Sequence, residues 1–200
     1  MDDPKQLNEL YADVEWALSE GLPATEVIFA LDRLKAAAPK GSGYELYTNR
    51  YLAEALLERA PFRALKCGRR ALELEEDACT FACVGIAHLS LKNDSSAELA
   101  FRGALRLEPE NPWYAHNLGH ILDTCLNRSE EALKWLESAH RALPDDVDVL
   151  LSLAHAVFRV QGEEPTRNLL LRAFEGSTSE VEGRLRSWRI EESQGAAGSE

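Results

Sequence analysis

A repeated pattern of small and large apolar residues constrains this 200-residue chain more than any other feature. Ala97, Phe101, Ala104 and Pro109 are followed one unit later by Ala132, Leu136, Ala139 and Pro144. Each unit also carries a glycine near its start, Gly85 in one and Gly119 in the next. A period of about 34 residues predicts an array of repeats that stack on one another, because a single unit cannot bury its apolar face alone.

Charge argues against several classes of partner. The chain carries 34 acidic and 22 basic residues, which gives a net charge of -12. A chain of this charge repels a phosphate backbone and an anionic membrane surface, so we expect neither nucleic acid nor membrane as a partner. No apolar run approaches the roughly 20 residues that span a bilayer.

The amino terminus and the cysteines favour a cytoplasmic location. The first ten residues, MDDPKQLNEL, lack the basic and apolar regions of a signal peptide. The four cysteines are spread through segments with helical periodicity and form no compact disulfide framework. We therefore expect reduced thiols at Cys67, Cys79, Cys83 and Cys125.

Helical periodicity continues on both sides of the clear repeats. Residues 4–20 and 23–39 each carry an apolar stripe at helical spacing, which predicts a helical hairpin or a degenerate first repeat over 1–43. Four repeats follow, over about 44–77, 78–111, 112–146 and 147–176. Sustained period-two alternation is absent, so we expect no sheet.

The boundaries of two later helices have their own signals. Asn127 is followed three residues later by Glu130, which predicts a capping box at the start of the helix that carries Leu136. Val181 and Trp188 lie on one stripe of a last helix over 177–192. This helix is expected to cover the core of the last repeat, although Trp188 would alternatively anchor a partner or a second copy. The small polar residues 193–200 are expected to be disordered.

The period, the small residues and the Ala, Phe or Leu, Ala, Pro succession resemble the tetratricopeptide repeat family. The resemblance implies an all-α, right-handed superhelical solenoid of antiparallel helix hairpins, closed by a capping helix. It also implies a non-enzymatic scaffold or adaptor that holds a peptide or helix of a partner protein in a concave groove. In this family the first helix of each repeat lines that groove.

The register implied by the resemblance selects one face of each first helix as the candidate partner-binding groove. Its residues are Asn49, Arg50, Cys83, Ile86, Trp113, His116, Asn117, His120, Asp123, His155 and Arg159. The third repeat is the most polar part of this face, with an aromatic ring, an amide and two imidazoles. Such groups suit an extended peptide, whose backbone needs donors and acceptors when it loses water.

The carboxylate clamp that many eukaryotic members of the family use for peptide C-termini is absent. Asn117 matches one asparagine of that clamp. The neighbouring clamp positions are Ala82 and Ile86 in the preceding repeat and Asp148 and Ser152 in the following one. Asp148 would repel a free carboxylate there, so a receptor for chaperone tails is not expected.

Metal binding and catalysis have weaker support. His116 and His120 stand four residues apart, a spacing that places two imidazoles on one helix face, with His155 and Cys83 as further candidate ligands. The pattern is nonspecific, and a metal role for this pair is left open. No glycine-rich phosphate loop or nucleophile elbow is present, so we expect no enzyme and no cofactor.

Two other functions remain alternatives to the adaptor. A secretion-type chaperone is also a small acidic repeat array with an amino-terminal helical extension, although such chaperones commonly have about three repeats. A structural homo-oligomer is the third possibility, and an uncovered Trp188 would suggest such self-association. The sequence names neither the partner nor the peptide motif.

Overall fold

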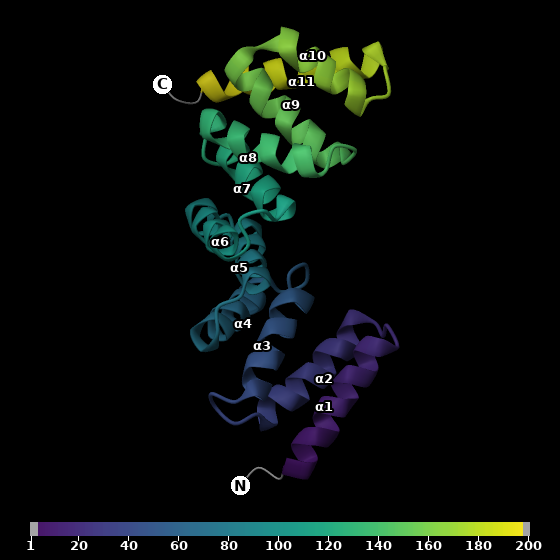
Figure 1. Cartoon of the computed structure of the whole chain (residues 1–200), viewed down its shortest axis with the longest axis vertical. Helices are drawn as coiled ribbons and strands as arrows, with labels where there is room; N and C mark the ends of the chain where they lie inside the picture. Colours follow the sequence, from purple (N-terminus) through teal and green to yellow (C-terminus); the bar gives the residue numbers. More distant parts are fainter. Residues whose placement is uncertain (1–3, 198–200) are drawn as a thin grey trace. The chain divides into compact units, whose positions relative to one another are not determined.

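The structure, a computed structural model, describes residues 4–197, with side chains described through Gln194. Every regular element in this range is an α-helix, so the all-α prediction is confirmed (Figure 1). The chain divides into two compact units, residues 1–109 and 110–200, and each is described by itself. None of the helices in 4–197 combines the length and apolar composition that crossing a bilayer requires.

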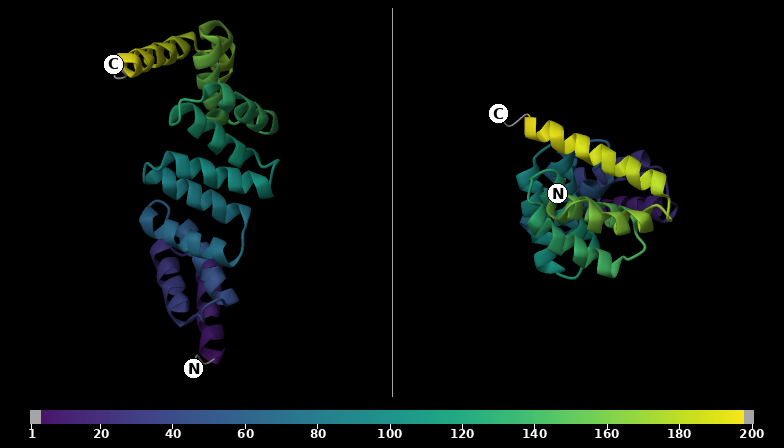
Figure 2. Two further views of the ribbon diagram at one scale, coloured as in Figure 1. Left: turned by 90° about the vertical axis from the view of Figure 1, so that its left-hand side faces the viewer. Right: turned by 90° about the horizontal axis from the view of Figure 1, so that it is seen from above.

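Unit 1 contains six helices that pair along the chain. They are α1 (Pro4–Ser19), α2 (Ala24–Ala37), α3 (Gly43–Ala55), α4 (Pro61–Leu74), α5 (Ala78–Ser90) and α6 (Asp94–Leu107). Leu31, Leu34 and Leu52 lie fully buried in a core that runs from α1 to α6. Successive helices pack side by side, as Figure 2 shows for α5 and α6.

Unit 2 contains two hairpins and a longer last helix. The elements are α7 (Pro112–Thr124), α8 (Ser129–Ala142), α9 (Val147–Gln161), α10 (Glu163–Ala173) and α11 (Thr178–Ala197). Phe158, Leu170 and Leu185 belong to a core cluster that joins α9, α10 and α11. The helix pairs from α3 to α10 occupy the ranges expected for the four repeats, and the division into repeats stays a prediction.

Glycines allow the two helices of a hairpin to touch. A methyl group added at Gly85 would lie 2.6 Å from a ring carbon of Phe101, and one at Gly119 would lie 2.6 Å from Cγ of Leu136. Both distances are shorter than a favourable carbon–carbon contact of about 3.5 Å. The repeated small and large residues are therefore partners across each hairpin, and this packing fixes the helix faces that remain outside it.

A side-chain cap begins each first helix of the four pairs. Asp77 accepts a hydrogen bond from the Thr80 amide at the start of α5, and Asp146 accepts one from the Val149 amide at the start of α9. Ser42 and Asn111 cap α3 and α7 in the same way. These caps satisfy amides that the helix cannot pair internally.

The last helix is longer than the sequence indicates. α11 continues past Ser193, where disorder was expected, to Ala197, and residues 198–200 lie outside the described range. Extending an existing helix fixes one residue for each new hydrogen bond, whereas starting one fixes several. The helix thus runs past Ser193, and the expected disorder of the tail stays a prediction.

Candidate functional site

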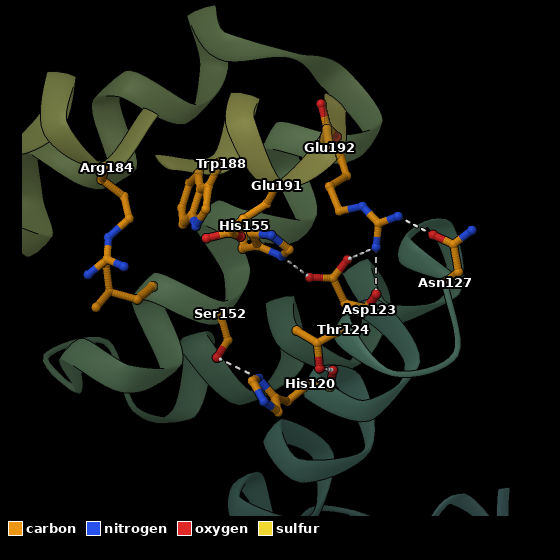
Figure 3. A pocket seen from close by; sticks show the side chains of 12 residues that line it. His120, Asp123, Thr124, Asn127, Ser152, His155, Arg184, Trp188, Glu191 and Glu192 are labelled. Carbon is orange, nitrogen blue, oxygen red and sulfur yellow. Dashed lines mark hydrogen bonds and ion pairs between the residues drawn. The ribbon is translucent and has the colours of Figure 1, made fainter. Parts of the chain in front are cut away.

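A cleft with a volume of about 940 Å³ opens in unit 2 beside α7, α9 and α11. Each helix contributes side chains that recur at helical spacing, so that they share one face. The lining consists of His120, Asp123 and Thr124 of α7, Asn127 of the following loop, Leu151, Ser152, His155 and Arg159 of α9, and Arg184, Trp188, Glu191 and Glu192 of α11. Figure 3 shows these side chains converging from the three helices.

Asp123 forms the floor of the cleft rather than its accessible surface. Only 1% of its surface is exposed, although the sequence places it among the groove residues. The Ser129 hydroxyl donates to its Oδ1 at 2.6 Å, and Nδ1 of His155 lies 2.5 Å from its Oδ2. Burial alone would raise the pKa of Asp123, but the hydrogen bonds from His155 and Ser129 hold that pKa below its ordinary value. Asp123 is therefore an ionised, internally paired carboxylate.

An ionised Asp123 determines which nitrogen of His155 carries a proton. A carboxylate can only accept a hydrogen bond, so Nδ1 of His155 donates to it. Nε2, on the other side of the ring, has no hydrogen-bond partner among the described residues. The Asp123 pair thus fixes the orientation of the His155 ring on the α9 side of the cleft.

Arg159 is held by the loop that follows α7. Its Nη1 donates to the Asp123 carbonyl oxygen at 2.6 Å, and its Nη2 donates to Oδ1 of Asn127. Asn127 has a φ of 55°, in the left-handed region that asparagine tolerates, and α8 begins only at Ser129. The capping box expected at Asn127 is therefore wrong, because its side chain is used across the cleft.

Trp188 closes the α11 side. It is 6% exposed and makes an edge-to-face contact with His155 at 4.9 Å and a tilted contact with Phe158 at 5.5 Å between ring centroids. Burial of an indole against these rings accounts for the position of α11. Trp188 covers the end of the unit, and a second copy has no access to it as an anchor.

The two histidines of α7 bind a serine instead of forming a recognisable metal site. Nε2 of His116 lies 3.0 Å from the Ser152 hydroxyl, and Nδ1 of His120 lies 3.5 Å from the same oxygen. Burial is the main reason that the pKa of each imidazole lies below its ordinary value. No group of three or more metal-binding side chains occurs among the residues that the structure describes.

The structure gathers His120, Asp123, His155 and Arg159 around one cleft. Trp113 is 49% exposed and Asn117 is half-buried, and both lie outside the lining, as does His116. The expected polar face of α7 is thus divided between the cleft and the neighbouring surface.

Comparisons with solved structures identify the fold of this chain. The match with a crystal structure of MamA protein covers 90% of this chain and 96% of the MamA chain, with a TM-score of 0.74 and 15% sequence identity. The structure of MamA 41-end from Desulfovibrio magneticus RS-1 matches 90% of this chain and 98% of its own, with a TM-score of 0.75 and 15% identity. MamA is a tetratricopeptide-repeat protein. This chain has the tetratricopeptide-repeat fold. No family model and no curated protein matches its sequence.

The candidate groove residues of unit 1 lie on the first helices α3 and α5. Arg50 forms ion pairs with Glu75 and Asp77, each at 2.9 Å, and is half-buried. Ile86 is partly exposed on α5. Arg50 lines a second cleft with a volume of about 480 Å³, beside the first helices α3 and α5.

Two predicted groove residues of unit 1 are buried. Cys83 lies at the base of the second cleft, while the neighbouring Cys79 is exposed. Asn49 is fully buried. Its side-chain oxygen accepts a hydrogen bond from Lys35 at 2.7 Å, and its side-chain nitrogen donates one to the Glu45 carbonyl oxygen at 2.7 Å. The expectation of an accessible surface is wrong for both residues, since side chains from neighbouring helices cover them.

Sequence reasoning missed the contribution of α11. Arg184, Glu191 and Glu192 line the unit 2 cleft, although that helix was expected to cover a core, with Trp188 alone as an alternative anchor for a partner. The signal was present in its periodicity, because Arg184 lies one turn before Trp188 and Glu192 one turn after it. The position of α11 beside this cleft could not be read from the pattern.

Proposed function

We propose that the chain is a non-enzymatic adaptor that holds an extended segment of a partner protein in the unit 2 cleft. The observation that carries this proposal is the open cleft itself, which is lined by hydrogen-bonding groups held in place from below. An extended segment has unpaired amides and carbonyls, and these groups must find partners when the segment leaves water.

The cleft provides both donors and acceptors at its surface. Arg184 is exposed, and no carboxylate lies within ion-pair distance of it in the described part of the chain. His120 offers an imidazole edge, and His155 offers its Nε2 atom to a ligand. The buried Asp123 fixes the His155 side chain, so little side-chain entropy is lost there when a ligand binds.

The tetratricopeptide-repeat fold supports a binding function over the alternatives. Repeat arrays of this kind expose extended surfaces that suit partner segments. An uncovered Trp188 would suggest self-association, whereas the indole is packed on His155 and Phe158, which removes this support for a homo-oligomer. A secretion-type chaperone commonly has about three repeats, whereas four repeats and a covering helix are expected here, so the adaptor role is the one we favour.

The cytoplasm is the compartment that we propose for this adaptor. All four cysteines lie within the described range and are free thiols. Free thiols are usual in a reducing compartment, and secreted proteins commonly oxidise them to disulfides.

Affinity capture with matched variants tests the cleft. We expect the double variant His120→Ala/Arg184→Ala to lose proteins that the wild-type chain retains, because it removes two exposed hydrogen-bonding groups from the lining. The control is Lys134→Ala/Arg141→Ala, which removes two exposed basic residues from α8 of the same unit.

A partner identified in this way is then titrated as a purified protein. Loss of two exposed hydrogen bonds to charged or polar groups predicts an affinity about tenfold lower for the cleft variant. Equal affinity for the cleft variant and the wild-type chain, with both correctly folded, would exclude this cleft as the binding site.

A further inference from the structure

A separate cleft in unit 1 combines positive charge with an exposed aromatic ring. It has a volume of about 470 Å³ and is formed by the end of α2, the start of α3 and one face of α4. Phe62 stands at its edge with 74% of its surface exposed, whereas Leu65, also in the lining, is buried in the core of the unit. The exposed ring offers a partner chain an apolar contact next to the charged groups of the cleft.

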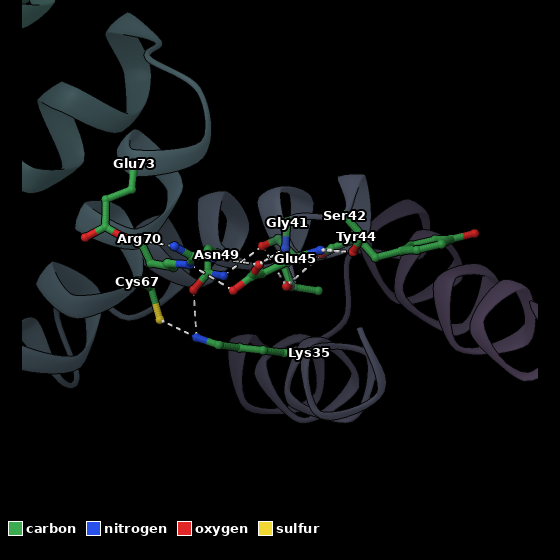
Figure 4. Close-up of polar contacts among 10 residues, drawn as sticks. Lys35, Gly41, Ser42, Tyr44, Glu45, Asn49, Cys67, Arg70 and Glu73 are labelled. Atoms are coloured by element: carbon green, nitrogen blue, oxygen red, sulfur yellow. Dashed lines mark hydrogen bonds and ion pairs between the residues drawn. The ribbon is translucent and has the colours of Figure 1, made fainter. Parts of the chain in front are cut away.

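The two carboxylates of this cleft are already paired. Arg70 donates to both oxygens of Glu45, at 2.8 and 3.0 Å, and to Glu73 at 2.9 Å. The hydrogen bond from Arg70, together with one from the Gly41 amide, lowers the pKa of Glu45 to about 2. Figure 4 shows Arg70 directed toward Glu45. This arrangement leaves no carboxylate of the cleft for its other cations.

Three further cations line the cleft, and none has a carboxylate within ion-pair distance among the described residues. Lys35 donates to Oδ1 of Asn49 at 2.7 Å and to Sγ of Cys67 at 3.1 Å (Figure 4). Lys66 is exposed on α4. Nη2 of Arg69 lies 3.4 Å from Nε2 of His88.

His88 does not supply the missing negative charge. Burial and the neighbouring Arg69 lower its pKa, so the imidazole is neutral at pH 7. The lining therefore contains four cations and two carboxylates, a net charge of +2, in a chain whose net charge is -12. A local excess of positive charge on an acidic protein attracts an acidic segment of a partner and repels a basic one.

We propose that this cleft is a second docking site, which binds an acidic peptide segment that carries an apolar side chain. Carboxylates of the segment pair with Lys66 and Arg69 and approach Lys35, while its apolar side chain packs on the exposed ring of Phe62. Charge complementarity selects the acidic segment, and the exposed ring selects an apolar residue within it. The site lies on the second helices α2 and α4 and does not depend on the unit 2 cleft.

A fluorescein-labelled peptide of about ten residues, glutamates on both sides of two central leucines, is the probe for this site. Fluorescence anisotropy is measured at low ionic strength, where the screening length is roughly 10 Å or more. We expect Lys66→Glu to weaken binding about fivefold to tenfold, because an attraction becomes a repulsion. Lys92→Glu is the control, since it makes the same change of charge at an exposed position of unit 1 outside the cleft.

A second pair of changes tests the apolar part of the proposal. A peptide with serine in place of both leucines should bind less tightly to the wild-type chain, and Phe62→Ser should weaken the leucine peptide by a similar factor. Phe62 is exposed, so this substitution leaves the fold intact. Addition of salt should weaken all of these complexes.

Two outcomes would overturn the proposal. Equal weakening by Lys66→Glu and Lys92→Glu would show that only the overall charge of the unit matters. No binding of the leucine peptide by the wild-type chain would show that the cleft does not take such a segment. Neither result bears on the unit 2 cleft, whose test uses other residues.

Discussion

Asp123 determines the local geometry of the unit 2 cleft through one carboxylate. It accepts from Ser129 and His155, and its carbonyl oxygen accepts from Arg159. We expect Asp123→Asn to lower the free energy of unfolding at pH 7 by about 2 kcal/mol, because hydrogen bonds to a charged partner are replaced by weaker ones. Urea unfolding of both proteins measures this difference.

The difference should depend on pH in a defined direction. The pKa of Asp123 is lower in the folded chain than its ordinary value of 3.8, so its contribution is complete above about pH 4 and is lost as the pH falls further. The wild-type and Asp123→Asn proteins should therefore converge in stability in acid. Asp148→Asn, at an exposed position of α9, should change stability by less than about 0.5 kcal/mol. A difference that stays constant down to pH 2 would contradict the role of this charge.

Single residues show where sequence reasoning ends. The helical periodicity of α7 and of α9 predicted that His120 and His155 point toward the same groove. Both residues line the unit 2 cleft. The same reasoning failed for Asn49 and Asp123, which have the same periodicity as exposed residues but are covered from elsewhere. Lys35 reaches Asn49 from 14 positions away and His155 reaches Asp123 from 32 positions away. Such contacts depend on tertiary structure and leave no local pattern.

Among the elements, α11 both covers a core and forms a cleft wall. Trp188 is the side chain that fixes it, with His155 and Phe158 against its ring. We expect Trp188→Ala to lower the free energy of unfolding by roughly 3–5 kcal/mol, as for other large buried side chains that leave a cavity. Urea unfolding followed by circular dichroism measures the loss, since the change also removes a fluorophore.

A surface tryptophan of the same unit supplies the control. Trp113 is half-exposed on α7, so Trp113→Ala should cost much less. Trp188→Ala should also increase binding of a dye for exposed apolar surface, because α11 would no longer cover Phe158 and Leu170. Equal losses for the two tryptophan variants would show that α11 is held by other contacts.

The helices themselves were the most predictable part of the molecule. Gly119 and Leu136 stand at repeated positions and meet across a hairpin, so the pattern that indicates the fold is also the one that packs it. Ends of helices were less predictable. Asn127 carries a capping signal yet is held by Arg159, because a tertiary hydrogen bond competes with the local one.

The whole molecule consists of two units, each with its own buried cluster. Leu31, Leu34 and Leu52 belong to the core of residues 1–109, whereas Phe158, Leu170 and Leu185 belong to that of residues 110–200. In a repeat array, stability is approximately a sum of the stabilities of the repeats and of their interfaces with nearest neighbours. The cluster of α9, α10 and α11 is formed by side chains of the second unit.

We expect fragment 110–200 to fold alone, with a helical circular dichroism spectrum and a cooperative urea transition. It retains the Asn111 cap of α7, the two hairpins and the covering helix α11. The same fragment with Leu136→Ala is the control, since loss of this buried side chain opposite Gly119 costs roughly 2–5 kcal/mol and should unfold a small unit. If the unaltered fragment is unfolded while the full chain is folded, unit 1 supplies stability that unit 2 lacks. If it folds, binding at the His120 and Arg184 cleft can be measured on unit 2 by itself.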